Sequence, residues 1–146
     1  MTYDDKVQWL RRFYKSVRRE EVLATEVERL RCEAERMTPL LSSVPGGGGN
    51  GKDRLPKAVE QIVQAQAELT CQINCTHAIR RQILDAIAAL PAAQHDVLRR
   101  KYILCQGTRE IVAYMHYSEG RIYQLHRDAV NQIKIADNYS ASDVKL

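Results

Sequence analysis

The chain has 146 residues, of which 45% are hydrophobic and 27% are charged, and its formal net charge is +4. This balance predicts one folded domain, or one domain with an extension, and excludes a disordered chain. The small charge also excludes a strongly basic tail, so any contact with nucleic acid would need a local patch of cations.

The N-terminal stretch MTYDDKVQWLRRFY carries acidic residues at once and lacks the apolar core of a secretory signal. No apolar run in the chain is long enough to cross a bilayer. We therefore expect a cytoplasmic protein with no membrane partner.

Residues 3–41 are predicted to form one long amphipathic helix. Its apolar residues step by three and four, with one skip near Glu20 that would locally disturb a coiled coil. They are Tyr3, Val7, Leu10, Tyr14 and Val17, then Leu23, Val27, Leu30, Ala34, Met37 and Leu41. Pro39 is expected to end this helix or to kink its last turn.

The same helix carries Arg11, Lys15 and Arg18 on one face. These cations could contact a DNA backbone or an acidic partner. They could equally form the solvated face of a coiled coil, and the acidic residues downstream favour that interpretation.

The stretch SSVPGGGGNGKDRLP, residues 42–56, contains four consecutive glycines flanked by Pro45 and Pro56, which cannot lie within a helix or a strand. Gly46, Gly51 and Lys52 match the spacing of a phosphate-binding loop. However, Asp53 replaces the required Ser or Thr, and the preceding segment is helical in pattern. We interpret the stretch as a glycine-rich linker.

A second long helix is predicted over residues 55–90, with Pro56 in its first turn. The residues of its predicted apolar stripe are spaced four and three positions apart. The linker is long enough for this helix to fold back antiparallel to the first one. The stripe residues are Leu55, Val59, Ile62, Gln66, Leu69, Ile73, Thr76, Arg80, Ile83, Ile87 and Leu90. Because each helix has a narrow apolar stripe, pairing of two hairpins into a homodimer is also expected.

The four cysteines occur without a secreted context, so we expect no disulfide framework. Cys71 and Cys75 are four residues apart, with His77 nearby, which could be half of a metal site. No second pair of ligands follows at short spacing, so semi-buried helix positions are the favoured interpretation. We expect no metal and no cofactor.

Three short helices are predicted after Pro91. The first covers AAQHDVLRRKYIL, the second follows Gly107 with Thr108 as a candidate cap, and Ser118 caps the third, which is predicted to reach residue 135. The inward residues of the third helix are Ile122, Leu125, Ala129 and Ile133. The tight turn before it matches a helix-turn-helix, although an ordinary three-helix packing unit fits the pattern equally well.

The outward residues of the third helix suit contact with DNA. Arginine reads guanine, glutamine reads adenine, and tyrosine can bond a phosphate. The candidate DNA-binding residues, with two from the second helix, are Thr108, Arg109, Ser118, Glu119, Gly120, Arg121, Tyr123, Gln124 and Arg127.

The stretch from ALPAAQHDVLRRKYI to REIVAYMHYSEGRIYQLHRDAV resembles the sigma-70 region 4-like helix-turn-helix. It is most similar to the version in small phage and prophage late-transcription regulators of the autolysin-regulator (ArpU/RinA-like) type. The matching residues are Leu90, Pro91, Leu98, Tyr102, Glu110, Ile111, Tyr117, Ser118, Ile122, Tyr123, Leu125, His126 and Ala129. The charged helix, glycine break and second helix upstream are also similar, so the resemblance extends over most of the chain.

Two residues depart from the pattern of that family. Val112 stands where a small alanine is expected, and His116 stands where the turn has glycine. His116 would therefore need a left-handed or otherwise adapted conformation.

The sequence as a whole predicts an all-α protein with three parts: a helical hairpin over 1–90, a sigma region 4-like helix-turn-helix over 91–137 and a flexible tail over 138–146. The resemblance implies a non-enzymatic transcriptional regulator that binds double-stranded DNA, alongside RNA polymerase. The histidines, His77, His95, His116 and His126, have no nucleophile or acid cluster at a recognisable spacing. The alternatives are a coiled-coil scaffold for protein partners and a small terminase-like packaging subunit.

Overall fold

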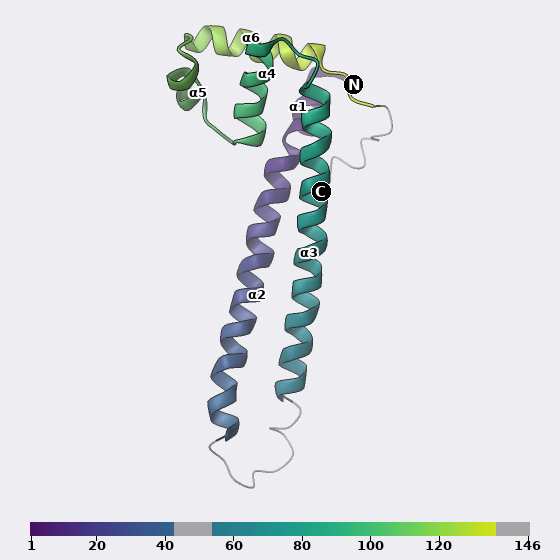
Figure 1. The fold of residues 1–146 in the computed structure, drawn as a ribbon, viewed down its shortest axis with the longest axis vertical. Helices are drawn as coiled ribbons and strands as arrows, with labels where there is room; N and C mark the ends of the chain where they lie inside the picture. The colour runs from purple at the N-terminus through teal and green to yellow at the C-terminus, as the bar shows by residue number, and fades with distance from the viewer. Residues whose placement is uncertain (43–53, 137–146) are drawn as a thin grey trace. The chain divides into compact units, whose positions relative to one another are not determined.

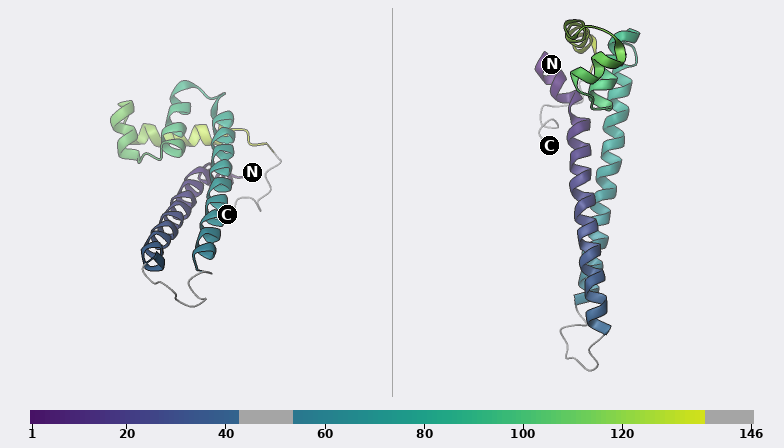
Figure 2. Two further views of the ribbon diagram at one scale, coloured as in Figure 1. Left: turned by 60° about the horizontal axis from the view of Figure 1, so that its bottom comes forward. Right: turned by 90° about the vertical axis from the view of Figure 1, so that its left-hand side faces the viewer.

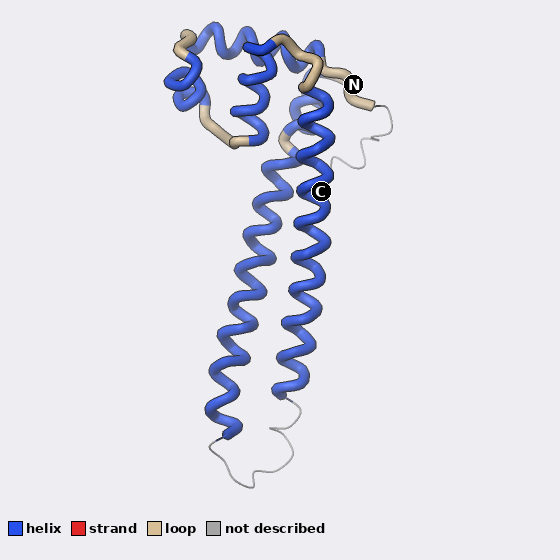
Figure 3. Tube along the Cα trace, in the orientation of Figure 1, coloured by secondary structure: helices blue, strands red, loops and turns tan. Residues whose placement is uncertain are grey.

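The structure, a computed structural model, describes residues 1–42 and 54–136, and every regular element within them is a helix (Figure 3). The predicted all-α class is confirmed. Most of the predicted linker and all of the predicted tail, 138–146, lie outside the described residues. The chain divides into two compact units. The terminal unit comprises Met1–Val17 and Thr76–Leu146, and the hairpin unit comprises Arg18–Cys75.

In the hairpin unit, residues 18–42 of α2 (Arg12–Ser42) and residues 54–75 of α3 (Arg54–Ile87) lie side by side and antiparallel (Figures 1 and 2). Pro56 lies in the first turn of α3, as predicted, where its missing N–H costs nothing. Pro39 does not end α2, which continues to Ser42. Among the residues of this unit whose side chains the structure describes, the buried apolar ones are Leu23, Val27 and Ala65.

The buried stripe of α2 is uninterrupted, so the predicted skip near Glu20 is wrong. Its buried and half-buried positions step by three and four without a break: Phe13, Ser16, Glu20, Leu23, Val27, Leu30, Ala34 and Met37. Two polar residues occupy stripe positions and concealed the pattern. Tyr14, which was predicted on the stripe, is 44% exposed instead.

The stripe of α3 differs from the prediction at four positions before residue 83, whereas Ile87 at its end is buried as predicted. Leu55, Ile62, Leu69, Thr76 and Ile83 face inward as predicted. Between them lie Ala58, Ala65, Gln72 and Ile79, each one residue earlier than the predicted Val59, Gln66, Ile73 and Arg80. Steps of three and four satisfy a heptad in either order, so the apolar pattern did not fix the phase.

A short helix, α1 (Tyr3–Leu10), precedes α2 and is separated from it at Arg11. The sequence predicted a single helix here, and no glycine or proline accounts for the break. Thr2 and Asp5 form a capping box at the start of α1. Trp9 and Leu10, at its end, are both buried.

Four helical segments follow α3 in the terminal unit. They are α4 (Ala92–Leu98), the π-helical turn η1 (Arg99–Ile103), α5 (Thr108–Met115) and α6 (Glu119–Gln132), three residues shorter than predicted. The wide turn of η1 directs Tyr102 and Ile103, adjacent residues, into the core.

The core of the terminal unit joins residues from both ends of the chain. The larger of two apolar clusters contains Trp9, Leu10, Ile83, Ile87, Leu98, Tyr102, Ile103, Ala129, Val130 and Ile133. The smaller contains Val97, Ile111, Ile122 and Leu125. The packing of α1 and the end of α3 with α6 was not predicted from sequence.

Polar contacts fix these long-range neighbours. The Lys6 ammonium donates to the carbonyl oxygens of Asn131 and Ile133, each at 2.9 Å. It thereby satisfies acceptors at the C-terminus of α6, where a positive charge is favourable. Ser16 Oγ and Thr76 Oγ1 form a buried hydrogen bond of 2.6 Å between α2 and α3.

Candidate nucleic-acid interface

The turn between α5 and α6 has the geometry that the sequence required. His116 adopts the left-handed conformation, with φ 58° and ψ 28°, and its N–H donates to the Val112 carbonyl. Ser118 is the N-cap of α6, and its Oγ accepts from the Arg121 N–H at 3.2 Å. Glu119 lies in the first turn, where its charge complements the helix dipole. The predictions for these residues are confirmed.

The inward stripe of α6 holds this helix against the rest of the terminal unit. Ile122, Leu125, Ala129 and Ile133 are each at most 4% exposed, as predicted. Ile111 of α5 packs with Ile122 and Leu125 in the smaller cluster. Burial of this stripe fixes which side of α6 faces solvent.

The outward side of α6 carries Arg121, Tyr123, Gln124 and Arg127, all exposed. The Arg121 guanidinium donates to Gln124 Oε1 at 3.2 Å. The Tyr123 hydroxyl donates to Glu119 Oε1 at 3.2 Å. These exposed bonds are weak enough to be exchanged for bonds to another molecule.

The remaining candidates lie at the starts of the two helices. Thr108 was predicted to cap α5, but Gly107 is the N-cap and no side chain bonds there, so this prediction is wrong. Thr108 is half-buried within the first turn, and Arg109 is exposed. A Cβ on Gly120 would meet no heavy atom within 4 Å, so packing in this chain does not require glycine there.

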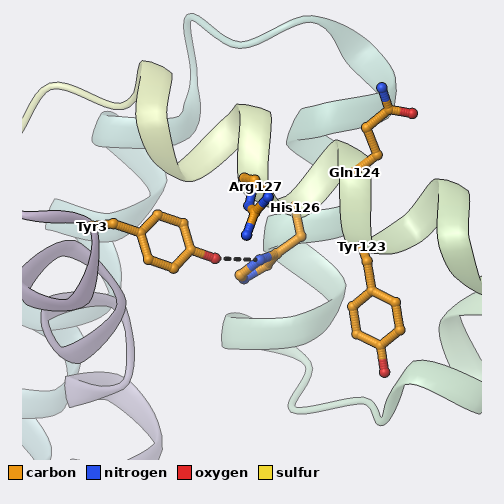
Figure 4. Close-up of a pocket in the computed structure, with 5 residues that line it drawn as sticks. All are labelled: Tyr3, Tyr123, Gln124, His126 and Arg127. Carbon is orange, nitrogen blue, oxygen red and sulfur yellow. Dashed lines mark hydrogen bonds between the residues drawn. The ribbon is translucent and has the colours of Figure 1, made fainter.

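Two tyrosines that sequence reasoning did not assign to the interface, Tyr3 and Tyr102, bond to His126, and Figure 4 shows the contact with Tyr3. Tyr3 Oη of α1 lies 3.2 Å from His126 Nδ1, and Tyr102 Oη of η1 lies 2.7 Å from His126 Nε2. His126 is 8% exposed and Tyr102 is 4% exposed. Tyr102 and His126 both belonged to the matched pattern, but no local signal connected Tyr3 to them.

Burial and nearby cations govern the ionisation of this group. Burial, with Lys101 and Arg11 beside it, lowers the pKa of His126 to about 4. Burial also raises the pKa of Tyr102 to about 12 and, with Arg11, lowers that of Lys101. At neutral pH the imidazole is therefore uncharged and both of its nitrogens are engaged.

An open hollow of about 490 Å³ lies beside His126. Its lining residues are Tyr3, Tyr123, Gln124, His126 and Arg127. Figure 4 shows the Arg127 side chain extending from α6 beside the His126 ring and the Tyr3 hydroxyl. The hollow thus connects α1 with the outward side of α6.

No group of three or more His, Cys, Asp or Glu side chains is placed to hold a metal ion within residues 1–42 and 54–136. Cys71 and Cys75 are exposed on α3, so the interpretation of these residues as semi-buried is wrong. Neither they nor Cys32 and Cys105 form a disulfide. In the same part of the chain, no helix combines the length and apolarity needed to cross a membrane.

Comparison with known protein families, with curated proteins and with solved structures finds no match to this chain.

Proposed function

We propose that this chain is a non-enzymatic, DNA-binding transcriptional regulator of a phage or prophage, sigma region 4-like, that acts in the cytoplasm alongside RNA polymerase. The observation that carries the proposal is the exposed pair Arg121 and Gln124, one turn inside the N-terminus of a helix that follows a well-formed turn. In a helix-turn-helix, this part of the second helix contacts base edges in the major groove.

The side chains on this face suit the two kinds of contact that such an interface needs. Arg121 can donate two bonds to guanine O6 and N7, and Gln124 can pair with adenine N6 and N7. Their mutual hydrogen bond holds both side chains on one side of α6 before binding. Arg127, further along, suits a phosphate, which fixes orientation and carries no sequence information.

The test of this function is a titration of the full-length protein with duplex DNA, followed by fluorescence anisotropy at several salt concentrations. We expect binding that weakens as salt rises, because cations released from phosphates drive association. Absence of any duplex affinity at low salt would overturn the proposal.

Exposed apolar residues favour a second property, pairing of two hairpin units into a homodimer. Val22 is 67% exposed, Val59 50% and Val63 58%. Val22 lies on α2 and the other two lie on α3, and such exposed apolar side chains favour burial against another surface. Light scattering should detect a dimer, and replacing both Val59 and Val63 with Glu should give a monomer.

The same residues favour the coiled-coil scaffold if the expected dimer is absent. A wild-type monomer at tens of micromolar, the range of weak self-association, would contradict the homodimer. Together with a lack of DNA binding, that result would favour protein partners for the hairpin unit.

A further inference from the structure

The direction in which the Tyr3 O–H points depends on which nitrogen of His126 carries the ring proton. The Tyr102 hydroxyl is buried, and its one hydrogen bond among the described residues is to His126 Nε2. If Nε2 carried the imidazole proton, the Tyr102 O–H would be left buried without an acceptor, which is costly. Tyr102 therefore donates to Nε2.

The neutral imidazole of His126 carries only one ring proton. Because Nε2 accepts, Nδ1 carries the single ring proton and donates to Tyr3 Oη. The Tyr3 hydroxyl proton is then not used by His126. Tyr3 is 37% exposed and lines the hollow, so its O–H is available to an acceptor there.

The hollow presents donors and positive charge. Besides the Tyr3 O–H, the lining of the hollow includes the N–H donors of the Arg127 guanidinium and the side-chain amide of Gln124. No carboxylate lines this hollow in the described part of the chain. The charged groups that act on His126 are Lys101 and Arg11, both cations. Donors and cations without a carboxylate favour an oxyanion as occupant.

We propose that the Tyr3 hydroxyl and the Arg127 guanidinium together bind one phosphate of the DNA backbone, so that α1 is part of the DNA interface. This inference rests on the proposed function, because duplex DNA is the source of the phosphate. Tyr3 supplies a directed neutral donor, and Arg127 supplies the charge.

The tautomer of His126 is the first test. Nitrogen-15 NMR of the full-length protein at neutral pH distinguishes a protonated Nδ1 from a protonated Nε2. We expect the proton on Nδ1. A proton on Nε2 would direct the Tyr3 O–H at the imidazole and overturn the proposal.

The second test uses inorganic phosphate, without DNA. Titration should give saturable shifts of the His126 ring and Arg127 side-chain signals. Tyr3→Phe should weaken this binding about tenfold, since it removes one hydrogen bond to a charged group, and Arg127→Gln should abolish it. Tyr14→Phe and Arg80→Gln, at other exposed positions, should leave it unchanged. Equal phosphate affinity in Tyr3→Phe and the wild type would refute the site.

The third test identifies the source of the phosphate. Tyr3→Phe should also weaken duplex binding about tenfold without changing its salt dependence, because no charge is lost. If phosphate binds but the duplex affinity of Tyr3→Phe equals that of the wild type, the site serves a free phosphate and the DNA assignment is wrong. If the wild type binds no duplex, the proposed function fails, and the assignment to DNA fails with it. The phosphate titration then decides whether the anion site itself exists.

Discussion

Arg121 and Arg127 are both exposed on α6, but because of their positions along the helix we expect their removal to affect DNA binding in different ways. Arg121→Ala should cost about 1–3 kcal/mol of binding free energy and relax preference at one base pair, because it removes a base-edge contact. Arg127→Ala should weaken binding to all sequences and lower the salt slope by about one phosphate contact. Anisotropy with matched and single-mismatch duplexes separates the two.

Neither substitution should change folding, because both side chains lie off the buried stripe of Ile122, Leu125 and Ala129. Circular dichroism and thermal unfolding provide the control. Arginine variants that bind like the wild type would mean that this face of α6 does not contact DNA.

His116 is a second residue with a local and testable consequence. It ends α5 with φ 58°, a left-handed backbone conformation that is unfavourable for any residue with a Cβ. His116→Gly should therefore raise the free energy of unfolding by about 0.5–1 kcal/mol. The matched control is His77→Gly within α3, which should lower it by roughly 0.3–0.5 kcal/mol, the difference between the helix propensities of glycine and histidine. A destabilised His116→Gly in urea unfolding would contradict the argument.

These residues were also the most predictable part of the site. The cap at Ser118 depends on neighbours within a few positions, so short-range pattern identified it. The left-handed His116 was expected because it stands where the resembled family has a turn glycine. The Thr108 prediction failed because Gly107, with extended backbone, takes the cap position one residue earlier. A shift of this size is common when cap residues adjoin.

At the scale of elements, the attachment of α1 to α6 depends on Lys6. Lys6→Met keeps the aliphatic stem but removes the two bonds to the Asn131 and Ile133 carbonyls. We expect a loss of about 1 kcal/mol in the free energy of unfolding.

Lys15→Met, at an exposed position of α2, should have little effect and is the control. Urea unfolding of both variants measures the difference. Equal stability of Lys6→Met and the wild type would indicate that apolar packing alone holds α1.

The helices themselves were predictable, but their facing sides were only partly so. Periodicity identified both partners of the hairpin, since charged and apolar residues alternate at helical spacing. The phase of α3 was not determined, because Val59 and Ala58 are both apolar and adjacent. In α2, Ser16 occupies a stripe position because Thr76 bonds to it from the other helix. That choice depends on a residue far away in sequence.

At the scale of the whole molecule, His126 connects protonation to stability. It faces Tyr3 on α1, Tyr102 and Lys101 on η1, and it is influenced by Arg11 between α1 and α2. Its pKa is about 4 in the folded protein, against about 6.5 when unfolded. Between these values the unfolded chain binds the proton and the folded chain does not. The contribution of the neutral His126 to the free energy of unfolding is therefore complete above pH 6.5 and is lost as the pH falls toward 4.

We expect this group to lower the free energy of unfolding by up to about 3 kcal/mol between pH 7 and pH 4. Urea unfolding at several pH values should show this loss in the wild type and a shallower one in His126→Gln. Parallel pH profiles for the two proteins would contradict the assignment.

The packing of the two ends of the chain into one core could not be predicted from the sequence. Trp9 and Tyr3 carry no signal that names α6 as their partner, because contacts between distant segments depend on the complete packing arrangement. The helix-turn-helix pattern predicted the outward face of α6 but not the neighbour that lies beside it. For this reason sequence reasoning connected Arg127 with no residue of α1, whereas in the structure Arg127, Tyr3 and His126 line one hollow.

The most direct test of the central claim is selection of bound duplexes from a random library by the wild-type protein and by Arg121→Ala. We predict that the wild type enriches a defined motif, and that the variant enriches the same motif with preference lost at one base pair. Failure of the wild type to enrich any sequence, or an identical motif for both proteins, would contradict base recognition by this face of α6.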